Sequence, residues 1–295
     1  MGSNRQSGDL PADDLRVDVD AVFQKKGRTL YRFIPRFVIN YIKRVIHQDE
    51  INDIVPRLSH LQGLAFIEEA LTKEFGITME VVNPENIPAE GRVIVVSNHP
   101  LGGLDGMALM HVIGKVRQDI QFIVNDILLE LKPLSPLFAP VNKHGRNTRE
   151  AIMLLDRLYA SEQLVIIFPA GLVSRRRKGV IADLEWKKSF ISKAIQYKRD
   201  IVPVYIEGRN SDFFYNLANW RKRLAIKSNI EMLYLPDELF KQRHKTIRIH
   251  FGPAVPWQTF NADRSQQEWA NQLREHVYKL ADGPLPFTPD GQAVS

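Results

Sequence analysis

The stretch Val93-Ile94-Val95-Val96-Ser97-Asn98-His99-Pro100-Leu101-Gly102-Gly103-Leu104-Asp105-Gly106 joins an apolar run to a glycine-rich turn. Its four β-branched residues predict a buried strand. The asparagine and the glycines permit a sharp turn and leave room for a substrate. A histidine and an aspartate in such a turn are a compact way to place a general base beside its orienting carboxylate. On spacing alone, ordinary turn chemistry explains these residues equally well.

Outward from this stretch, strand-like and helix-like segments alternate. We expect strands over residues 78–82, 92–97, 120–125, 138–142, 164–168, 201–206 and 246–251. We expect helices over residues 60–75, 106–115, 148–160, 184–198, 212–223 and 266–281. The alternation predicts an α/β fold, a mixed β-sheet flanked by helices. Ligands of such sheets bind beyond the carboxyl ends of the strands, which makes loops 98–106, 143–147 and 169–178 candidate sites.

Length and composition set further limits. The 295 residues, 44% of them hydrophobic, suffice for one large α/β domain with a helical extension. The absence of cysteine excludes disulfides, a cysteine nucleophile and a thiolate metal site, and agrees with a reducing compartment. The histidines form no close cluster, so we expect no metal. No phosphate loop, dinucleotide fingerprint or serine elbow occurs, so we expect no bound cofactor.

The N-terminal part predicts a contact with an anionic partner. Residues 1–20 predict a disordered acidic lead, and residues 21–76 a helical, membrane-associating region. Residues 21–48 contain seven basic residues and no acidic one, and the net charge of the chain is +6. Apolar pairs recur every four positions from Phe33 to Ile46, which predicts an amphipathic helix. Its apolar stripe either lies in a membrane surface or packs on the domain core. No apolar run approaches the ~20 residues needed to span a bilayer.

Two other loops carry positive charge. Lys143 and Arg146 straddle a glycine just before an expected helix, which suits an anion site or a solvated loop. The third loop continues from Phe168-Pro169-Ala170-Gly171 to Ser174 and the cations 175–178. Four consecutive cations after a buried strand are hard to bury, so we expect them to face solvent or a ligand. Phosphate, an acidic carrier protein or a lipid head group is a simpler ligand than nucleic acid, because no aromatic-rich nucleic-acid module accompanies them.

Taken in order, these motifs resemble those of the glycerolipid acyltransferases of the PlsC-like (lysophosphatidic acid acyltransferase) superfamily, over about residues 81–257. The resemblance rests on four blocks: Asn98-His99 with Asp105, Val141-Asn142-Lys143, Phe168-Pro169-x-Gly171 with Ser174-Arg175, and Ile201-Val202-Pro203-Val204. The family usually has four residues between the histidine and the aspartate, and here there are five. Ala170 replaces the usual glutamate, Leu172-Val173 replaces a Thr-Arg pair, and Lys143 stands where arginine is commoner. The Asn-His-Pro-x-Gly-Gly-x-Asp form and the Phe-Pro-Ala-Gly form resemble those of a bacterial branch, often labelled hemolysin-like, that is related to lyso-ornithine and lyso-glycine lipid O-acyltransferases.

The resemblance implies a PlsC-like acyltransferase domain over residues 77–281. Prolines and glycines after it predict a flexible tail over 282–295. It implies an O-acyltransferase that moves a fatty acyl group from acyl carrier protein or coenzyme A to the hydroxyl of a lyso-lipid. The acceptor would be a lyso-aminolipid or a lysophospholipid, in membrane lipid biosynthesis. The alternatives are a 1-acylglycerol-3-phosphate acyltransferase of phospholipid metabolism, a non-catalytic lipid-binding protein of the membrane surface, and a lipid hydrolase.

The resemblance also assigns roles to residues. His99 would be the general base and Asp105 its orienting partner. The expected substrate-binding residues are Asn98, Gly102, Gly103, Lys143, Arg146, Phe168, Pro169, Gly171, Ser174, Arg175 and Arg176. Backbone N–H groups near Gly102 or Gly171 would stabilise the oxyanion. The acyl thioester would be a co-substrate rather than a cofactor, and the enzyme would bind anionic lipid peripherally on the cytoplasmic face of the membrane.

Overall fold

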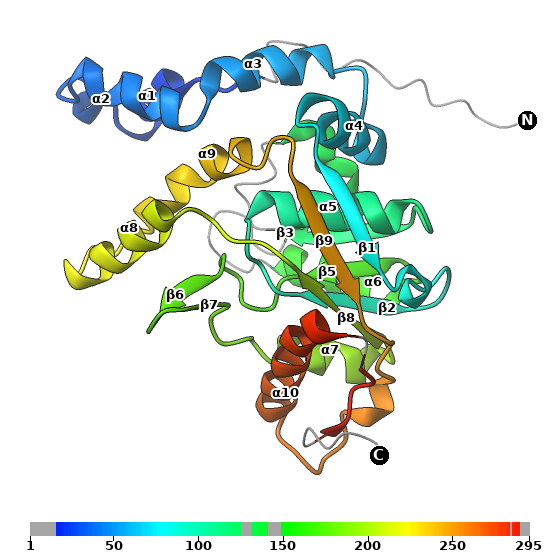
Figure 1. The fold of residues 1–295 in the computed structure, drawn as a ribbon. Coiled ribbons are helices and arrows are strands. Elements are labelled where there is room, and N and C mark those ends of the chain that lie inside the picture. The colour runs from blue at the N-terminus through cyan, green and yellow to red at the C-terminus, as the bar shows by residue number, and fades with distance from the viewer. Residues whose placement is uncertain (1–15, 125–130, 141–148, 284, 290–295) are drawn as a thin grey trace, which may run out of the picture.

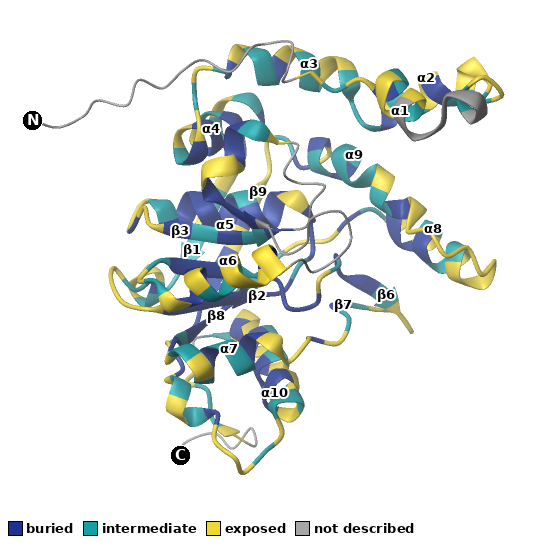
Figure 2. Cartoon of the chain, turned by 180° about the vertical axis from the view of Figure 1, so that it is seen from behind, coloured by how far each residue is buried: buried dark blue, intermediate teal, exposed yellow. Residues whose placement is uncertain are grey.

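The computed structural model describes residues 16–124, 131–140, 149–283 and 285–289, and the side chains of these residues except those of 25–30 and Pro140. Figure 1 shows a central sheet covered by helices, with the N-terminal helices extending along one end. Figure 2 shows that the buried residues gather in the sheet and on the inner faces of its helices. The layers of an α/β fold, which the alternation predicts, are therefore present.

Seven strands form the main sheet in the order β1-β9-β8-β2-β5-β3-β4. Their bounds are β1 Thr78–Val82, β2 Val93–Ser97, β3 Ile120–Val124, β4 Phe138–Pro140, β5 Leu164–Ile167, β8 Asp200–Ile206 and β9 Thr246–Phe251. The β8–β9 pair is antiparallel, whereas β2 is parallel to both of its neighbours, β8 and β5. The sheet is thus mixed, as expected. All five residues of β2 are buried, because helices cover both faces of the sheet.

Alternate residues of the central strand supply two cores. Val93 and Val95 join the core beneath α4 (Gly63–Glu69) and α5 (Gly103–Gly114). Ile94 and Val96 join the core beneath α6 (Arg149–Ala160), α7 (Ser189–Tyr197) and α10 (Gln266–Lys279). This period of two is what a strand buried on both faces requires. Both cores therefore pack on β2, and the chain leaves the sheet at the end of this strand, beside α5.

Some element boundaries differ from the expectations. The third loop contains a hairpin, β6 (Arg175–Arg177) with β7 (Val180–Ala182), where we expected irregular structure. α8 (Asp212–Arg223) has the expected bounds, and α9 (Leu235–Phe240) follows it unforeseen. α7 begins five residues later than expected and α5 three residues earlier. The shorter helices are η2 Ala70–Glu74, η3 Pro84–Asn86, η5 Lys132–Leu137, η6 Ile230–Tyr234, η7 Trp257–Thr259 and η8 Leu280–Asp282.

The N-terminal region consists of α1 (Val19–Tyr31), α2 (Arg36–Val45) and α3 (Gln48–Arg57). The expected disordered lead extends to residue 20, but residues 16–20 have defined contacts. Val19 is buried, and Asp20 forms ion pairs with Arg36 and Lys43. Residues 1–15 lie outside the described residues. Within the expected tail, the ring of Phe287 contacts Trp269 in α10.

One buried arginine joins the sheet to its helices. Arg199 precedes β8, has no exposed surface, and donates hydrogen bonds to the carbonyls of Val93, Leu158, Tyr159, Ser161 and Gln163. These carbonyls belong to the end of α6 and to the starts of β2 and β5. A single cation thus satisfies helix-end carbonyls that would otherwise lack donors.

Candidate active site

The turn after β2 brings His99 and Asp105 into contact. Nδ1 of His99 lies 2.8 Å from Oδ2 of Asp105. Gly102 has a φ of +87°, in the left-handed region that favours glycine, and α5 begins at the next residue. Asp105 therefore falls in the first turn of α5, where its side chain points back to the turn. The extra residue between the histidine and the aspartate does not separate them.

Asp105 has no exposed surface. Its Oδ2 also accepts the N–H groups of Leu101 at 2.9 Å and Gly102 at 3.0 Å. Its Oδ1 has no hydrogen-bond partner among the described residues. Burial raises the pKa of the Asp105 carboxyl above its ordinary value, and the hydrogen bonds from His99 and the two amides oppose this rise. The helix N-terminus further favours the negative charge.

The ring of His99 stacks on Phe168, the residue after β5, with 4.1 Å between ring centroids. The His99 side chain is 16% exposed. Because Nδ1 donates to Asp105, Nε2 is the nitrogen left to accept a proton, and it has no hydrogen-bond partner in the described part of the chain. The arrangement can act as a general base with an orienting carboxylate.

Other predicted residues hold the backbone of the turn. The side chain of Asn98 donates to the carbonyl of Ile206 at 2.9 Å and accepts its N–H at 2.7 Å. The N–H of Ser174 donates to the carbonyl of His99 at 2.7 Å. Asn98 and Ser174, which we expected to bind substrate, are both buried and fix the turn against β8 and the third loop.

The sequence analysis missed Asp183, which follows β7. Its Oδ1 accepts the N–H of His99 at 3.1 Å and the hydroxyl of Ser174 at 2.6 Å. Its Oδ2 accepts the indole N–H of Trp186 at 2.9 Å. Asp183 is buried, so this carboxylate positions the His99 backbone, whereas Asp105 contacts the His99 ring. No sequence spacing indicates that role, because 84 residues separate Asp183 from His99.

The expected oxyanion donors are already engaged. The N–H of Gly102 donates to Asp105, and that of Gly171 donates to the carbonyl of Phe168 at 3.0 Å. Pro169 lies in the same turn, and its carbonyl accepts an N–H at 3.1 Å. Gly103 is exposed and begins α5, and the first amides of a helix have no acceptor within it. Gly103 is therefore the better-placed donor for a developing negative charge.

The cations of the third loop engage the region around α8. Arg175 is 3% exposed, and its Nη2 lies 2.9 Å from the buried carboxylate of Glu231 in η6. Arg176 pairs with Asp212 at 2.7 Å. Burial lowers the pKa of Arg175, and Glu231 opposes this. The expectation that all four cations face solvent or a ligand is wrong for Arg175. Lys143 and Arg146 lie outside the described residues.

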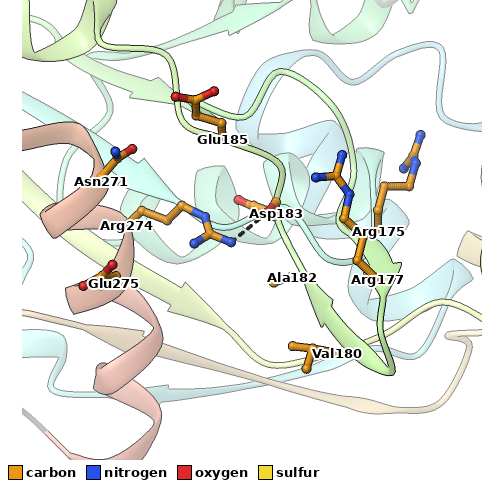
Figure 3. Close-up of a pocket in the computed structure, with 9 residues that line it drawn as sticks. All are labelled: Arg175, Arg177, Val180, Ala182, Asp183, Glu185, Asn271, Arg274 and Glu275. Atoms are coloured by element: carbon orange, nitrogen blue, oxygen red, sulfur yellow. Dashed lines mark hydrogen bonds between the residues drawn. The ribbon is translucent and has the colours of Figure 1, made fainter. Parts of the chain in front are cut away.

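A cavity of about 430 Å³ lies between the β6–β7 hairpin and α10 (Figure 3). Arg177 and Arg274 line it together with Glu185 and Glu275, so it offers both charges to a ligand. Arg274 also donates to the carbonyl of Asp183 at 2.8 Å. Asp183 lines this cavity and also accepts the N–H of His99, so this one residue links the cavity to the turn. The described residues contain no cluster of three or more His, Asp or Glu side chains suited to a metal ion.

Comparison with known proteins gives a family match and two similar sequences. The family model described as Acyltransferase matches residues 21–283. The lyso-glycine lipid O-acyltransferase of Bacteroides thetaiotaomicron is 48% identical over 265 residues, which are 90% of this chain and 97% of that protein. The enzyme of the same name from Phocaeicola vulgatus is 45% identical over 265 residues, 90% of this chain and 95% of that one.

A solved structure of the 1-acyl-sn-glycerophosphate (LPA) acyltransferase PlsC from Thermotoga maritima is also similar. It has a TM-score of 0.46 and 19% identity, and the match covers 88% of this chain and 91% of that chain. A likeness of this degree supports no conclusion about the reaction.

Proposed function

This chain belongs to the acyltransferase family, and from that membership we propose which lipid it acylates and how. It is an enzyme that transfers an acyl group to a lysolipid. We propose that the acceptor is a lyso-glycine lipid and that a hydroxyl oxygen of this lipid is acylated. The observation that supports this acceptor is the 45 to 48% identity, over 90% of the chain, to two lyso-glycine lipid O-acyltransferases.

The His99–Asp105 contact supports a general-base reaction. Nε2 of His99 removes the proton of the acceptor hydroxyl while its oxygen attacks the carbonyl carbon of an acyl thioester. Asp105 holds the ring and stabilises the imidazolium that forms. The amide of Gly103, at the N-terminus of α5, donates to the oxyanion. Collapse of the tetrahedral intermediate forms the ester and breaks the C–S bond, and the leaving thiolate takes the proton from His99.

The donor and the location are parts of the same proposal. A thioester of acyl carrier protein or coenzyme A supplies the acyl group, at the cytoplasmic face of the membrane. In α2 and the turn before it the apolar stripe divides: Ile39 and Val45 are buried, whereas Phe33, in the turn, and Phe37 are 79% and 74% exposed. The exposed part supports peripheral contact with lipid, and the buried part accounts for packing on the protein. Among the described residues, no helix is both long enough and apolar enough to cross a bilayer.

The test is an acceptor panel with purified protein. Acyl-carrier and coenzyme A thioesters are each offered with lyso-glycine lipid, lyso-ornithine lipid or lysophosphatidic acid, and products are identified by mass spectrometry. We expect diacylated glycine lipid as the main product and a loss of about 10²–10⁴-fold in the His99→Ala variant. Preference for lysophosphatidic acid would instead identify a 1-acylglycerol-3-phosphate acyltransferase. Release of free fatty acid without an acceptor would contradict acyl transfer.

A further inference from the structure

A second segment is similar in composition to the N-terminal region, although we predicted no membrane contact for it from the sequence. Residues 213–230, in α8 and the turn after it, include Arg221, Lys222, Arg223 and Lys227 and no acidic residue. The same segment exposes large apolar side chains: Trp220 is 61% exposed and Leu224 71%. Such a mixture of cations and exposed apolar groups calls for an explanation, because monomeric soluble proteins seldom expose contiguous apolar surface.

The exposed apolar residues share one face of α8. Phe213, Trp220 and Leu224 are seven and four residues apart, which is two turns and one turn of helix. The residues that α8 buries, Phe214 and Ala218 among them, lie on the opposite face. The inward face therefore already accounts for the packing of α8 on the domain. On the outward stripe Phe213 contacts Tyr234, whereas Trp220 and Leu224 stay largely exposed.

This stripe is continuous with the exposed part of α2. Phe213 meets the ring of Tyr234 with 4.9 Å between centroids, and the hydroxyl of Tyr234 lies 2.9 Å from that of Tyr41 in α2. Figure 1 shows α2 and α8 projecting on the same side of the molecule, and Figure 2 shows exposed residues on both. We call this surface the aromatic band, and its members are Phe33, Phe37, Tyr41, Phe213, Trp220, Leu224 and Tyr234.

The aromatic band adjoins the His99 turn. Leu235 follows Tyr234, and its Cδ2 would lie 3.1 Å from a Cβ placed on Gly102. Glu231, four residues earlier, pairs with Arg175 at 2.9 Å and with Arg221 at 2.8 Å. The end of α8 is thus fixed to β6 through a buried carboxylate, so the band keeps a set position relative to the site.

We propose that residues 213–230 form a second membrane-contacting surface, which together with α2 seats the His99 turn on an anionic lipid bilayer. Charge complementarity identifies the occupant. Lys222, Arg223 and Lys227 are exposed beside the apolar stripe, and cations beside bulky apolar groups bind anionic lipid surfaces. The inference deepens the proposed function, because it assumes that the acceptor is met in a bilayer.

Trp220 is a built-in probe for this contact. Trp186 and Trp269 are buried and Trp257 is half-buried, so Trp220 is the most exposed tryptophan of the chain. We expect vesicles of phosphatidylglycerol and phosphatidylcholine to shift the tryptophan emission of the full chain to the blue, and brominated lipid to quench it. In the Trp220→Phe variant the shift should vanish while flotation with the vesicles persists.

Substitutions test the contribution of the stripe to binding. We expect Trp220→Ala/Leu224→Ala to weaken vesicle binding about tenfold or more, because two large side chains no longer enter the lipid. Replacing Lys222, Arg223 and Lys227 by Gln should weaken binding by roughly fivefold per charge on anionic vesicles and little on phosphatidylcholine alone. The matched control is Val116→Ala/Leu285→Ala, which removes exposed apolar side chains, 44% and 48% exposed, outside the band.

The inference is overturned if the band variant and the control variant float equally, or if Trp220 emission does not respond to bound vesicles. It is also overturned if the band variant loses self-association in light scattering while vesicle binding stays unchanged, since a second copy of the chain would then cover the band. Acyl transfer in detergent micelles separates the two proposals. Transfer by wild type without vesicle binding leaves the proposed function standing, and no transfer in micelles refutes that function whatever the vesicles show.

Discussion

The Asp105→Asn variant isolates the charge of the orienting carboxylate. Asparagine keeps the shape of the side chain and one carbonyl oxygen. That oxygen can still accept the N–H groups of Leu101 and Gly102, which lie 2.9 and 3.0 Å from the native Oδ2. We therefore expect the turn to keep its shape. The variant loses the negative charge that faces the imidazolium formed during proton transfer, and an –NH2 group takes the place of Oδ1, which has no hydrogen-bond partner among the described residues.

The size of the effect follows from the geometry. Nδ1 and Oδ2 are 2.8 Å apart and the carboxylate is fully buried, so the centres of the two charged groups lie about 4 Å apart. At an effective dielectric constant of about 20, two unit charges at that distance attract by ~4 kcal/mol. Because about 1.4 kcal/mol corresponds to a factor of ten in rate, we expect kcat to fall by about 10³-fold.

The assay measures acyl transfer to lyso-glycine lipid in detergent micelles, beside the thermal unfolding midpoint. His111→Ala is the matched control. His111 lies on the same helix and pairs with Glu68 at 3.0 Å, so this variant removes a histidine–carboxylate pair without touching the turn. Its kcat should stay near that of wild type. An Asp105→Asn enzyme with unchanged stability and kcat within about tenfold of wild type would refute the reasoning.

Three further predictions concern positioning, stability and pH. Asp183→Asn should lower kcat by about ten- to a hundredfold with little change in KM, because Asp183 holds the amide of His99; a change in KM alone would contradict this. Arg199→Leu should lower the free energy of unfolding by ~3–5 kcal/mol in urea titrations, since five carbonyls lose their buried donor; a loss below ~1 kcal/mol would argue against it. Burial, and then the charge of Lys279, lowers the pKa of His276 to about 4. The unfolded histidine titrates near ~6.5, so the unfolded state binds more protons in between, and stability is lost as pH falls from about 6.5 to 4. His276→Phe should flatten the dependence of Tm on pH in that window, and an equally steep dependence would count against the assignment.

The sequence predicts the sheet well for a physical reason. β-branched runs separated by amphipathic stretches have few ways to bury their apolar groups, so all seven expected strands form. The His99–Asp105 contact was also accessible, because both residues lie in one local turn. The start of α5 was placed three residues late, because Asp105 caps the N-terminus of the helix from within.

Contacts between charged residues and groups far away in the sequence could not be predicted in the same way. Arg175 looks like a solvated cation in the sequence, but Glu231, 56 residues later, neutralises it in the interior. Asp183 looks like a lone acid, and only the folded chain brings it to His99. The boundaries at residues 20, 76 and 281 remain predictions, as do the roles of Lys143 and Arg146.

Arg199 has a consequence for how such an enzyme can change. It joins the starts of β2 and β5 at the beginning of β8, whereas His99 lies at the opposite ends of these parallel strands. Arg199 therefore holds the strands together at their starts, and the chemistry takes place at their carboxyl ends. A substitution at the exposed Gly103, beside the chemistry, leaves the hydrogen bonds of Arg199 in place. In such an architecture, residues around the chemistry can change during evolution without removing the hydrogen bonds that stabilise the fold.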